Sequence, residues 1–170
     1  SVYPRSSGME VNQICNLTGG PYKFDNYRAR GRVVFQNKPP MCQYRAVGHP
    51  IAITVTEGLV EMAASAIDME SIEMRKLNMV ADDDYPNKTV SGIPLENLSH
   101  QASTDKLMEM VNYKEIRDEQ KKLRKEGIYR GVGFAALIEV TNPGPAFYGV
   151  GGAPISAQDG CSVKLDAKGN

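Results

Sequence analysis

The sequence predicts an α+β fold, with mixed strands and helices packed on one side. Residues 28–36 and 132–140 carry β-branched and aromatic or alternating side chains, which is typical of strands. Between them, apolar residues recur at three- and four-residue steps from residue 50 to 67, which indicates a helix. The 170 residues suit one ordinary domain.

Composition excludes several classes of protein. The 20 acidic and 20 basic residues leave no net charge, which argues against a nucleic-acid or anionic-membrane surface. No apolar run approaches the roughly 20 residues of a membrane span, and none of signal-peptide type opens the sequence. Cys15, Cys42 and Cys161 are widely spaced and odd in number, so we expect reduced thiols, a cytoplasmic protein and no cysteine metal site.

The first half of the chain is expected to contain one strand and two helices. Residues 1–20 are polar and glycine-containing, and we expect them to be irregular. The strand 28–36 is followed by a loop and by the helix 50–67, within which Gly58 suggests close packing against a neighbour. A short helix is expected over 70–78. The inward face predicted for the long helix consists of Ile51, Val55, Leu59, Met62, Ala63 and Ala66.

The second half is expected to contain helices, then strands. Residues 80–101 hold three consecutive aspartates and two prolines, which favours an extended surface connection with a solvated acidic loop. Helices are predicted over 103–112, capped by Ser103, and over 114–125, ended by Gly127. Strands are then expected over 132–140 and 162–166, separated by a glycine-rich loop at 144–152.

One loop, residues 39–50 (PPMCQYRAVGHP), is the strongest functional candidate. Its paired prolines hold the incoming backbone extended, Gly48 allows a conformation closed to other residues, and Pro50 suits the first turn of a helix. Arg45 therefore lies on a loop between a strand and a helix, where scaffolds commonly hold binding groups. Taken alone, an arginine is more often an exposed or structural residue than a ligand-binding one.

This loop resembles the A-[YF]-R-G-x-G-x-P loop of the molybdenum hydroxylases, which include xanthine dehydrogenases, aldehyde oxidases and three-subunit bacterial relatives. Three further stretches occur in the family's order: GPYKFDNYR at 20–28, IDMESIEMRKLNM at 67–79 and RGVGFAALIEVT at 130–141. The resemblance covers nearly the whole chain. It implies that residues 1–170 are part of a molybdopterin-binding domain.

The resemblance also implies roles for particular residues. In the family the loop approaches the molybdenum–pterin cofactor, so Gln43, Tyr44, Arg45 and Ala46 become the expected cofactor-binding residues. Val47 stands where relatives often place an aromatic ring of the substrate pocket, which implies an aliphatic wall here. Ala46 replaces the cysteine of carbon monoxide-oxidising members, which makes carbon monoxide a poor substrate.

Two residues outside the loop are weaker candidates. Gln13 falls where purine-oxidising relatives place an arginine that contacts substrate, and an ordinary polar residue is an equally good interpretation. Glu139 is a carboxylate within an apolar strand, for which a paired structural role is favoured over a base with a raised pKa. It matches a strand glutamate of the family and not the catalytic one. His49 and His100 have no partner at metal-ligand spacing.

The family resemblance implies a molybdenum-dependent oxidoreductase that hydroxylates an N-heterocycle or aldehyde with water-derived oxygen. Iron–sulfur (2Fe-2S) and FAD groups are then expected on partner subunits or domains. The family's catalytic glutamate motif and its pterin-gripping glycine–glutamine motifs are not found in this sequence. We therefore expect an internal piece of the large subunit, without a catalytic residue of its own, that docks onto the remaining segments and is inactive alone. The alternative is a non-catalytic α+β interaction module derived from such a subunit.

Overall fold

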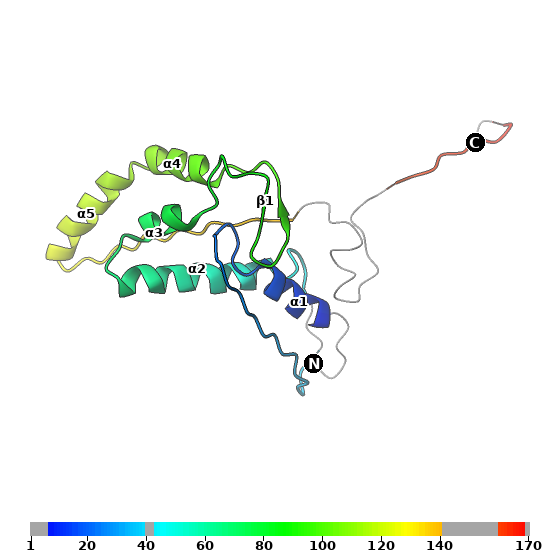
Figure 1. Ribbon diagram of the computed structural model, residues 1–170, viewed down its shortest axis with the longest axis horizontal. Coiled ribbons are helices and arrows are strands. Elements are labelled where there is room, and N and C mark those ends of the chain that lie inside the picture. The colour runs from blue at the N-terminus through cyan, green and yellow to red at the C-terminus, as the bar shows by residue number, and fades with distance from the viewer. Residues whose placement is uncertain (1–6, 40–42, 141–159, 169–170) are drawn as a thin grey trace.

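The computed structural model describes residues 7–39, 43–140 and 160–168. Within them lie five helices and one small sheet at the side of the helices, which confirms the α+β class (Figure 1). The sheet pairs β1 and β2 antiparallel, with Asn87 opposite Leu95. The elements are α1 (Ser7–Leu17), α2 (His49–Ala66), α3 (Ser71–Asn78), β1 (Asn87–Lys88), β2 (Pro94–Leu95), α4 (His100–Met110) and α5 (Tyr113–Lys125).

Helix α2 is the axis of the packed body. Helix α1 lies near its beginning, α3 lies alongside it, and α4 and α5 lie beyond α3 (Figure 1). The apolar side chains buried between these elements all come from residues 9 to 95: Met9, Leu17, Tyr22, Ala52, Ala64, Ile72, Met79, Val80 and Leu95. This core is small and holds several alanine-sized and polar residues, so much of the large apolar surface stays outside it.

Helix α1 corrects the expectation that residues 1–20 are irregular. Met9, Gln13 and Leu17 are buried at four-residue steps, which is the spacing of one helix face. Because Gln13 is polar, the sequence shows no continuous apolar stripe on this face of the helix. Its burial comes from contact with α2, which begins more than thirty residues later.

The bounds predicted for α2 and α3 are confirmed, but the predicted inward face of α2 is wrong. Ile51, Val55, Leu59 and Met62 are 43–69% exposed. The buried face instead carries small and polar residues, because the neighbouring elements meet α2 with hydrogen-bonding groups. The backbone N–H of Gly19, for example, donates to the Thr56 hydroxyl over 2.9 Å. The buried residues of α2 are His49, Ala52, Thr56, Glu57 and Ala64.

Helix α4 begins at His100, three residues before its predicted start, because its cap comes from a distant part of the chain. The Asp82 carboxylate accepts hydrogen bonds from the backbone N–H groups of Gln101 and Ala102, at 3.1 and 2.8 Å. Asp82 is therefore a helix cap and not part of a solvated acidic loop. The segment 80–101 also contains β1 and β2, where a plain surface connection was expected.

Helix α5 occupies the predicted range. Gly127 follows its end with φ +78°, the left-handed conformation expected there. The backbone N–H of Ile128 closes the turn on the Leu123 carbonyl at 3.0 Å.

The three strands predicted over 28–36, 132–140 and 162–166 are wrong as strands. These segments join no sheet among the described residues. Burial still alternates from residue 133 to 140, so that segment has the two-residue period of a strand without a neighbouring strand. The glycine-rich loop expected at 144–152 lies outside the described residues.

Segment 128–140 is held by helix side chains in place of a sheet. It runs between α2 and α3 in Figure 1, and each of four helices contributes one side chain that bonds its backbone. These hydrogen bonds satisfy some of the backbone N–H and C=O groups that a neighbouring strand would otherwise pair. They are Gln120 to the Arg130 carbonyl (2.8 Å), Arg75 to Phe134 (3.1 Å), His100 to Leu137 (3.1 Å) and the Val140 N–H to His49 (3.1 Å).

No single helix in the described part of the chain is long and apolar enough to cross a membrane. Helices α2 and α3 would pass that test only as a pair, and they are bent by 115° relative to each other.

Candidate functional site: the loop between residues 43 and 48

The base of the loop is fixed by a close approach between Gly48 and α1. Gly48 has φ +77°, the conformation predicted for it. A Cβ atom there would lie 2.8 Å from both the Cβ of Gln13 and the backbone nitrogen of Ile14. Only glycine fits this contact, because a side chain would meet backbone as well as side-chain atoms. Pro50 lies in the first turn of α2, as predicted.

The tip of the loop presents Tyr44 and Arg45 to solvent. Tyr44 is 88% exposed, and the guanidinium carbon of Arg45 lies 5.0 Å from the centre of its ring. This is cation–π geometry. Within the described part of the chain Arg45 has no carboxylate partner, so its five N–H donors can meet an anionic group. Gln43 precedes this pair and is half-buried.

Backbone hydrogen bonds set the conformation of Ala46 and Val47, both of them half-buried. Ala46 has φ +53°, which is uncommon for a residue with a Cβ. Its carbonyl accepts the backbone N–H of His49 at 2.8 Å, and the Val47 carbonyl lies 3.2 Å from Nδ1 of the same histidine. His49 is thus a loop-supporting residue that the sequence analysis missed, since it was tested only for metal-ligand spacing.

The structure brings Gln13 to the base of the loop and leaves Glu139 apart from it. Gln13 is fully buried beneath Gly48, so its amide is not on the surface beside Arg45. Glu139 is exposed, which favours a role other than that of a buried base. Among the described residues no cluster of histidine, cysteine, aspartate or glutamate has the arrangement of a metal site.

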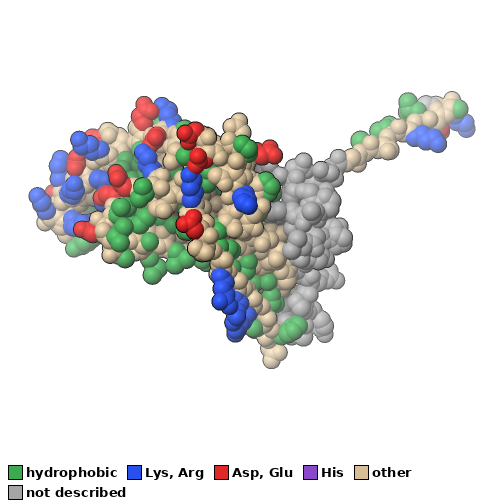
Figure 2. Space-filling view, viewed as in Figure 1, with side chains coloured by type: hydrophobic (Ala, Val, Ile, Leu, Met, Phe, Trp, Pro, Cys, Tyr) green, Lys and Arg blue, Asp and Glu red, His purple; other side chains and the backbone are tan. Residues whose placement is uncertain are grey.

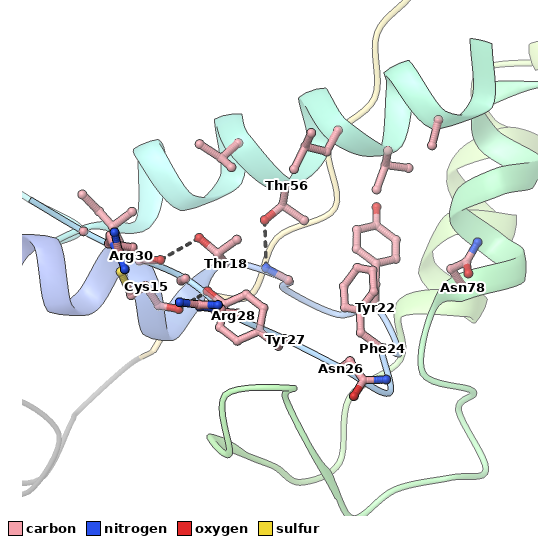
Figure 3. A pocket seen from close by; sticks show the side chains of 18 of the residues that line it. Cys15, Thr18, Tyr22, Phe24, Asn26, Tyr27, Arg28, Arg30, Thr56 and Asn78 are labelled. Atoms are coloured by element: carbon pink, nitrogen blue, oxygen red, sulfur yellow. Dashed lines mark hydrogen bonds between the residues drawn. The ribbon is translucent and has the colours of Figure 1, made fainter. Parts of the chain in front are cut away.

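A second feature that the sequence did not indicate is an apolar cavity of about 730 Å³ (Figure 3). It lies between α1, the segment 24–31 and the exposed face of α2, and no residue of the loop 43–48 lines it. Figure 3 shows Tyr22, Phe24 and Tyr27 grouped at this cavity with Thr56 of α2. Its aliphatic wall is formed by Val55, Leu59, Val60 and Ala63. Part of the exposed apolar face of α2 therefore lines the cavity.

Beside this cavity lies a buried polar cluster. The Tyr22 hydroxyl donates to Oε1 of Glu57 over 2.7 Å, and Arg75 donates from Nε to Oε2 over 2.8 Å. Burial and then the Glu57 carboxylate raise the pKa of the Tyr22 hydroxyl well above its ordinary value. Burial lowers the pKa of Arg75, but hydrogen bonds to Glu57 and Glu61 outweigh this effect, so its pKa is raised overall. Both groups are therefore fixed in one protonation state at neutral pH.

Comparison with known proteins finds the same similarity in a family model and in a solved structure. Residues 2–79, which include α1, the loop and α2, match the molybdopterin cofactor-binding domain. The chain is also similar to solved quinoline 2-oxidoreductase from Pseudomonas putida 86, with 25% identity and a TM-score of 0.66, over 85% of this chain and 18% of that one. The chain is therefore similar, over most of its length, to proteins of the molybdenum hydroxylase family.

Two curated relatives also match most of the length of this chain. The chain is 28% identical over 168 residues to the gamma subunit of the 6-hydroxypseudooxynicotine dehydrogenase complex of Paenarthrobacter nicotinovorans, covering 95% of this chain and 21% of that subunit. It is 23% identical over 169 residues to the carbon monoxide dehydrogenase large chain of Hydrogenophaga pseudoflava, covering 92% and 20%. The chain therefore spans about a fifth of the length of these relatives.

These matches confirm the resemblance carried by the four sequence stretches, and with it the molybdopterin cofactor. The loop 43–48 lies inside the matched domain, whereas α4, α5 and segment 128–140 lie beyond it. The roles of individual loop residues stay predictions.

Proposed function

We propose that this chain is part of the cofactor-binding catalytic subunit of a molybdenum-dependent oxidoreductase, and that the whole enzyme hydroxylates an N-heterocycle or aldehyde with oxygen derived from water. The observation that carries the proposal is the exposed Arg45 on a loop within the range that matches the molybdopterin cofactor-binding domain. Within the subunit, Gln43, Tyr44, Arg45 and Ala46 would line the cofactor and Val47 the substrate pocket, with Gln13 behind it. The cytoplasmic location remains a prediction.

The residues of the loop suit an anionic, oxygen-rich cofactor. The Arg45 guanidinium offers several N–H donors, and stacking on Tyr44 restricts its position without using those donors. The positive φ of Ala46 and Gly48 turns the backbone sharply on both sides of Val47. When bound, the molybdenum cofactor supplies the redox chemistry, while these residues hold its periphery and shape the space beside it.

The loop also bears on the substrate. Val47 offers an aliphatic surface and no ring on which a flat heterocycle could stack. Carbon monoxide is not part of the proposal, although carbon monoxide dehydrogenases are among the relatives, because Ala46 cannot supply the thiol expected of such enzymes.

The proposal also includes partners for this chain. The first partner is the remainder of the large subunit, and the exposed surface of α2 supports it. Ile51, Val55, Leu59 and Met62 form one stripe of this helix and are all exposed. The stripe borders the apolar cavity, and side chains of hydrophobic type cover much of this region in Figure 2. We infer that the remaining segments of the large subunit cover this surface, since the relatives are about five times longer than this chain. Iron–sulfur and FAD groups would reside on further subunits or domains.

A non-catalytic module is the second candidate, and it predicts a self-sufficient core. The described residues bury few large apolar side chains and expose a continuous apolar stripe on the central helix. This distribution favours a piece of a larger subunit, which we expect to bind the cofactor weakly and to be inactive by itself.

Molybdenum content tests the cofactor proposal. We expect the full subunit, expressed from the complete reading frame that contains this chain, to retain molybdenum, and we expect Arg45→Gln to lower that content and the activity. Arg124→Gln is the matched control, because Arg124 is exposed on α5 away from the loop. Unchanged molybdenum content and activity in Arg45→Gln would contradict a cofactor role for Arg45. If the isolated 170-residue chain bound molybdenum stoichiometrically, the proposal that this chain holds only part of the cofactor site would be refuted.

The docking surface has its own test. Leu59→Ser and Met62→Ser are expected to change the stability of the isolated chain by less than about 0.5 kcal/mol, since both side chains are largely exposed. In the full subunit the same substitutions would bury a hydroxyl against apolar surface and lower its melting temperature. Equal effects in both contexts would mean that nothing covers this face.

A further inference from the structure

His49 occupies a special position between the loop and the distant segment 128–140. It is the first residue of α2 and is only 4% exposed. Its Nε2 atom lies 3.1 Å from the backbone nitrogen of Val140, and its Nδ1 atom lies 3.2 Å from the carbonyl oxygen of Val47. One imidazole therefore bridges two backbone segments, and Val140 lies 91 residues after His49 in the chain.

These two contacts define the protonation state of the ring. The backbone N–H of Val140 can only donate, so Nε2 must offer its lone pair. The Val47 carbonyl can only accept, so Nδ1 must carry the proton. Both requirements are met by the neutral imidazole with its proton on Nδ1. The opposite tautomer would place two donors together at Val140 and two acceptors together at Val47, and an imidazolium would keep the first of these conflicts.

The bridge supports the strained part of the loop. The backbone N–H of His49 binds the Ala46 carbonyl while its ring binds the Val47 carbonyl, so one residue holds two successive carbonyl groups. Left-handed backbone costs roughly 1–2 kcal/mol at a residue with a Cβ, as at Ala46 with φ +53°. The hydrogen bonds of His49 oppose this cost at the turn that directly follows Arg45.

The ring of His49 lies in mostly apolar surroundings. The His49 side chain lines a small pocket together with apolar residues of α2 and of segment 136–138, and Thr56 is the polar neighbour in this pocket. No titratable side chain other than His49 lines this pocket in the described part of the chain. The nearest carboxylate along α2, Glu57, is bonded to Tyr22 and Arg75, and Glu139 of the opposite segment is exposed.

We propose that His49 is a positioning residue, which in its neutral Nδ1–H form fixes the conformation of the loop 43–48 and couples it to segment 128–140. Its consequence for the cofactor and substrate rests on the function proposed above, whereas the coupling itself does not.

The test compares wild-type full subunit with His49→Gln and His49→Phe. Glutamine keeps an oxygen that can accept from Val140, whereas phenylalanine keeps a ring without nitrogen. We expect amide hydrogen exchange in a peptide ending at Val140 to be slow in wild type, partly protected in His49→Gln and faster by on the order of tenfold in His49→Phe, the effect of losing about one hydrogen bond. Equal exchange in all three proteins would overturn the proposal.

The tautomer of the ring separates positioning from simple packing. The ¹⁵N resonances of the wild-type imidazole are expected to show the proton on Nδ1, and an Nε2–H tautomer would exclude the bridge. This measurement also decides the matter if His49→Phe does not fold.

The same preparations keep this proposal distinct from the proposed function. If Arg45→Gln left the molybdenum content of the subunit unchanged, this result would count against the cofactor role of the loop. The exchange at Val140 would still decide whether His49 holds the two segments together.

Discussion

Arg75 donates a hydrogen bond from Nε to Oε2 of Glu57 over 2.8 Å, although the two side chains are only 2% and 8% exposed. The second oxygen of Glu57 accepts from Tyr22, and the other end of the guanidinium reaches the Phe134 carbonyl. The pair therefore joins α2, α3, the segment after α1 and segment 128–140. A buried charge that loses its partner stays uncompensated, so the fold depends more on this pair than on any of its exposed ion pairs.

Arg75→Met is expected to lower the free energy of unfolding by about 3–5 kcal/mol, because it leaves the Glu57 carboxylate buried without its cation. Urea unfolding of the purified chain measures this change. The control is Arg124→Met on the exposed side of α5, with an expected change within about 0.5 kcal/mol. A loss below about 1 kcal/mol for Arg75→Met would show that the pair is not buried in solution.

Stability is expected to fall in acid. A hydrogen bond from Ser71 lowers the pKa of Glu61, and one from Arg117 lowers the pKa of Glu70, both below the ordinary value of 4.5. A lowered folded-state pKa contributes stability above the unfolded value, and this contribution is lost as the pH falls through the folded value. Melting temperatures should therefore drop below about pH 4.5, and less steeply in Glu70→Gln. An identical slope in the variant would contradict the Arg117 contact.

Stability is also expected to fall in alkali, because of Tyr22. Burial and the Glu57 carboxylate raise the pKa of this hydroxyl above its ordinary value of 10.0. A raised folded-state pKa leaves stability intact below pH 10 and removes it above, since only the unfolded chain then releases the proton. Tyr22→Phe should lose stability at neutral pH and show a shallower alkaline decline, measured by circular dichroism. An alkaline decline as steep as that of wild type would assign the effect to another group.

Two glycines of similar appearance in the sequence should respond oppositely to alanine. At Gly48, φ is +77° and the new Cβ would meet α1 at 2.8 Å, so Gly48→Ala is expected to destabilise by more than about 1 kcal/mol. At Gly58, inside α2, nothing lies within 4 Å, so Gly58→Ala is expected to stabilise by about 1 kcal/mol. Thermal unfolding distinguishes the two results. A stabilising Gly48→Ala would mean that the loop does not contact α1.

Gly58 also corrects an expectation from the sequence. Close packing against a neighbour was expected there, but none of the described residues from other elements lies within 4 Å of a Cβ atom at this position. If the rest of the subunit covers the exposed face of α2, the same alanine would be tolerated in the isolated chain and would disturb the full subunit.

The sequence by itself determined the local features of this protein. Helix bounds at α2, α3 and α5, the left-handed Gly48 and Gly127, and the position of Pro50 all follow from periodicity and from the steric limits of single residues. The four short stretches that resemble the molybdenum hydroxylases also indicated the family and its cofactor before any contact was known. These features depend on residues that are neighbours in the chain, which is why they can be read from it.

Only the tertiary structure decided which partners those elements have. The period of α2 shows that Val55 and Leu59 share a face, but not whether α1 and α3 pack on that face or on the one with Thr56 and Glu57. Segment 132–140 has a strand's alternation, yet its backbone bonds go to side chains from three helices. The same applies to Asp82 as the cap of α4 and to His49 between Val47 and Val140. Each of these pairings closes a long loop, and nothing in the local sequence specifies the distant partner.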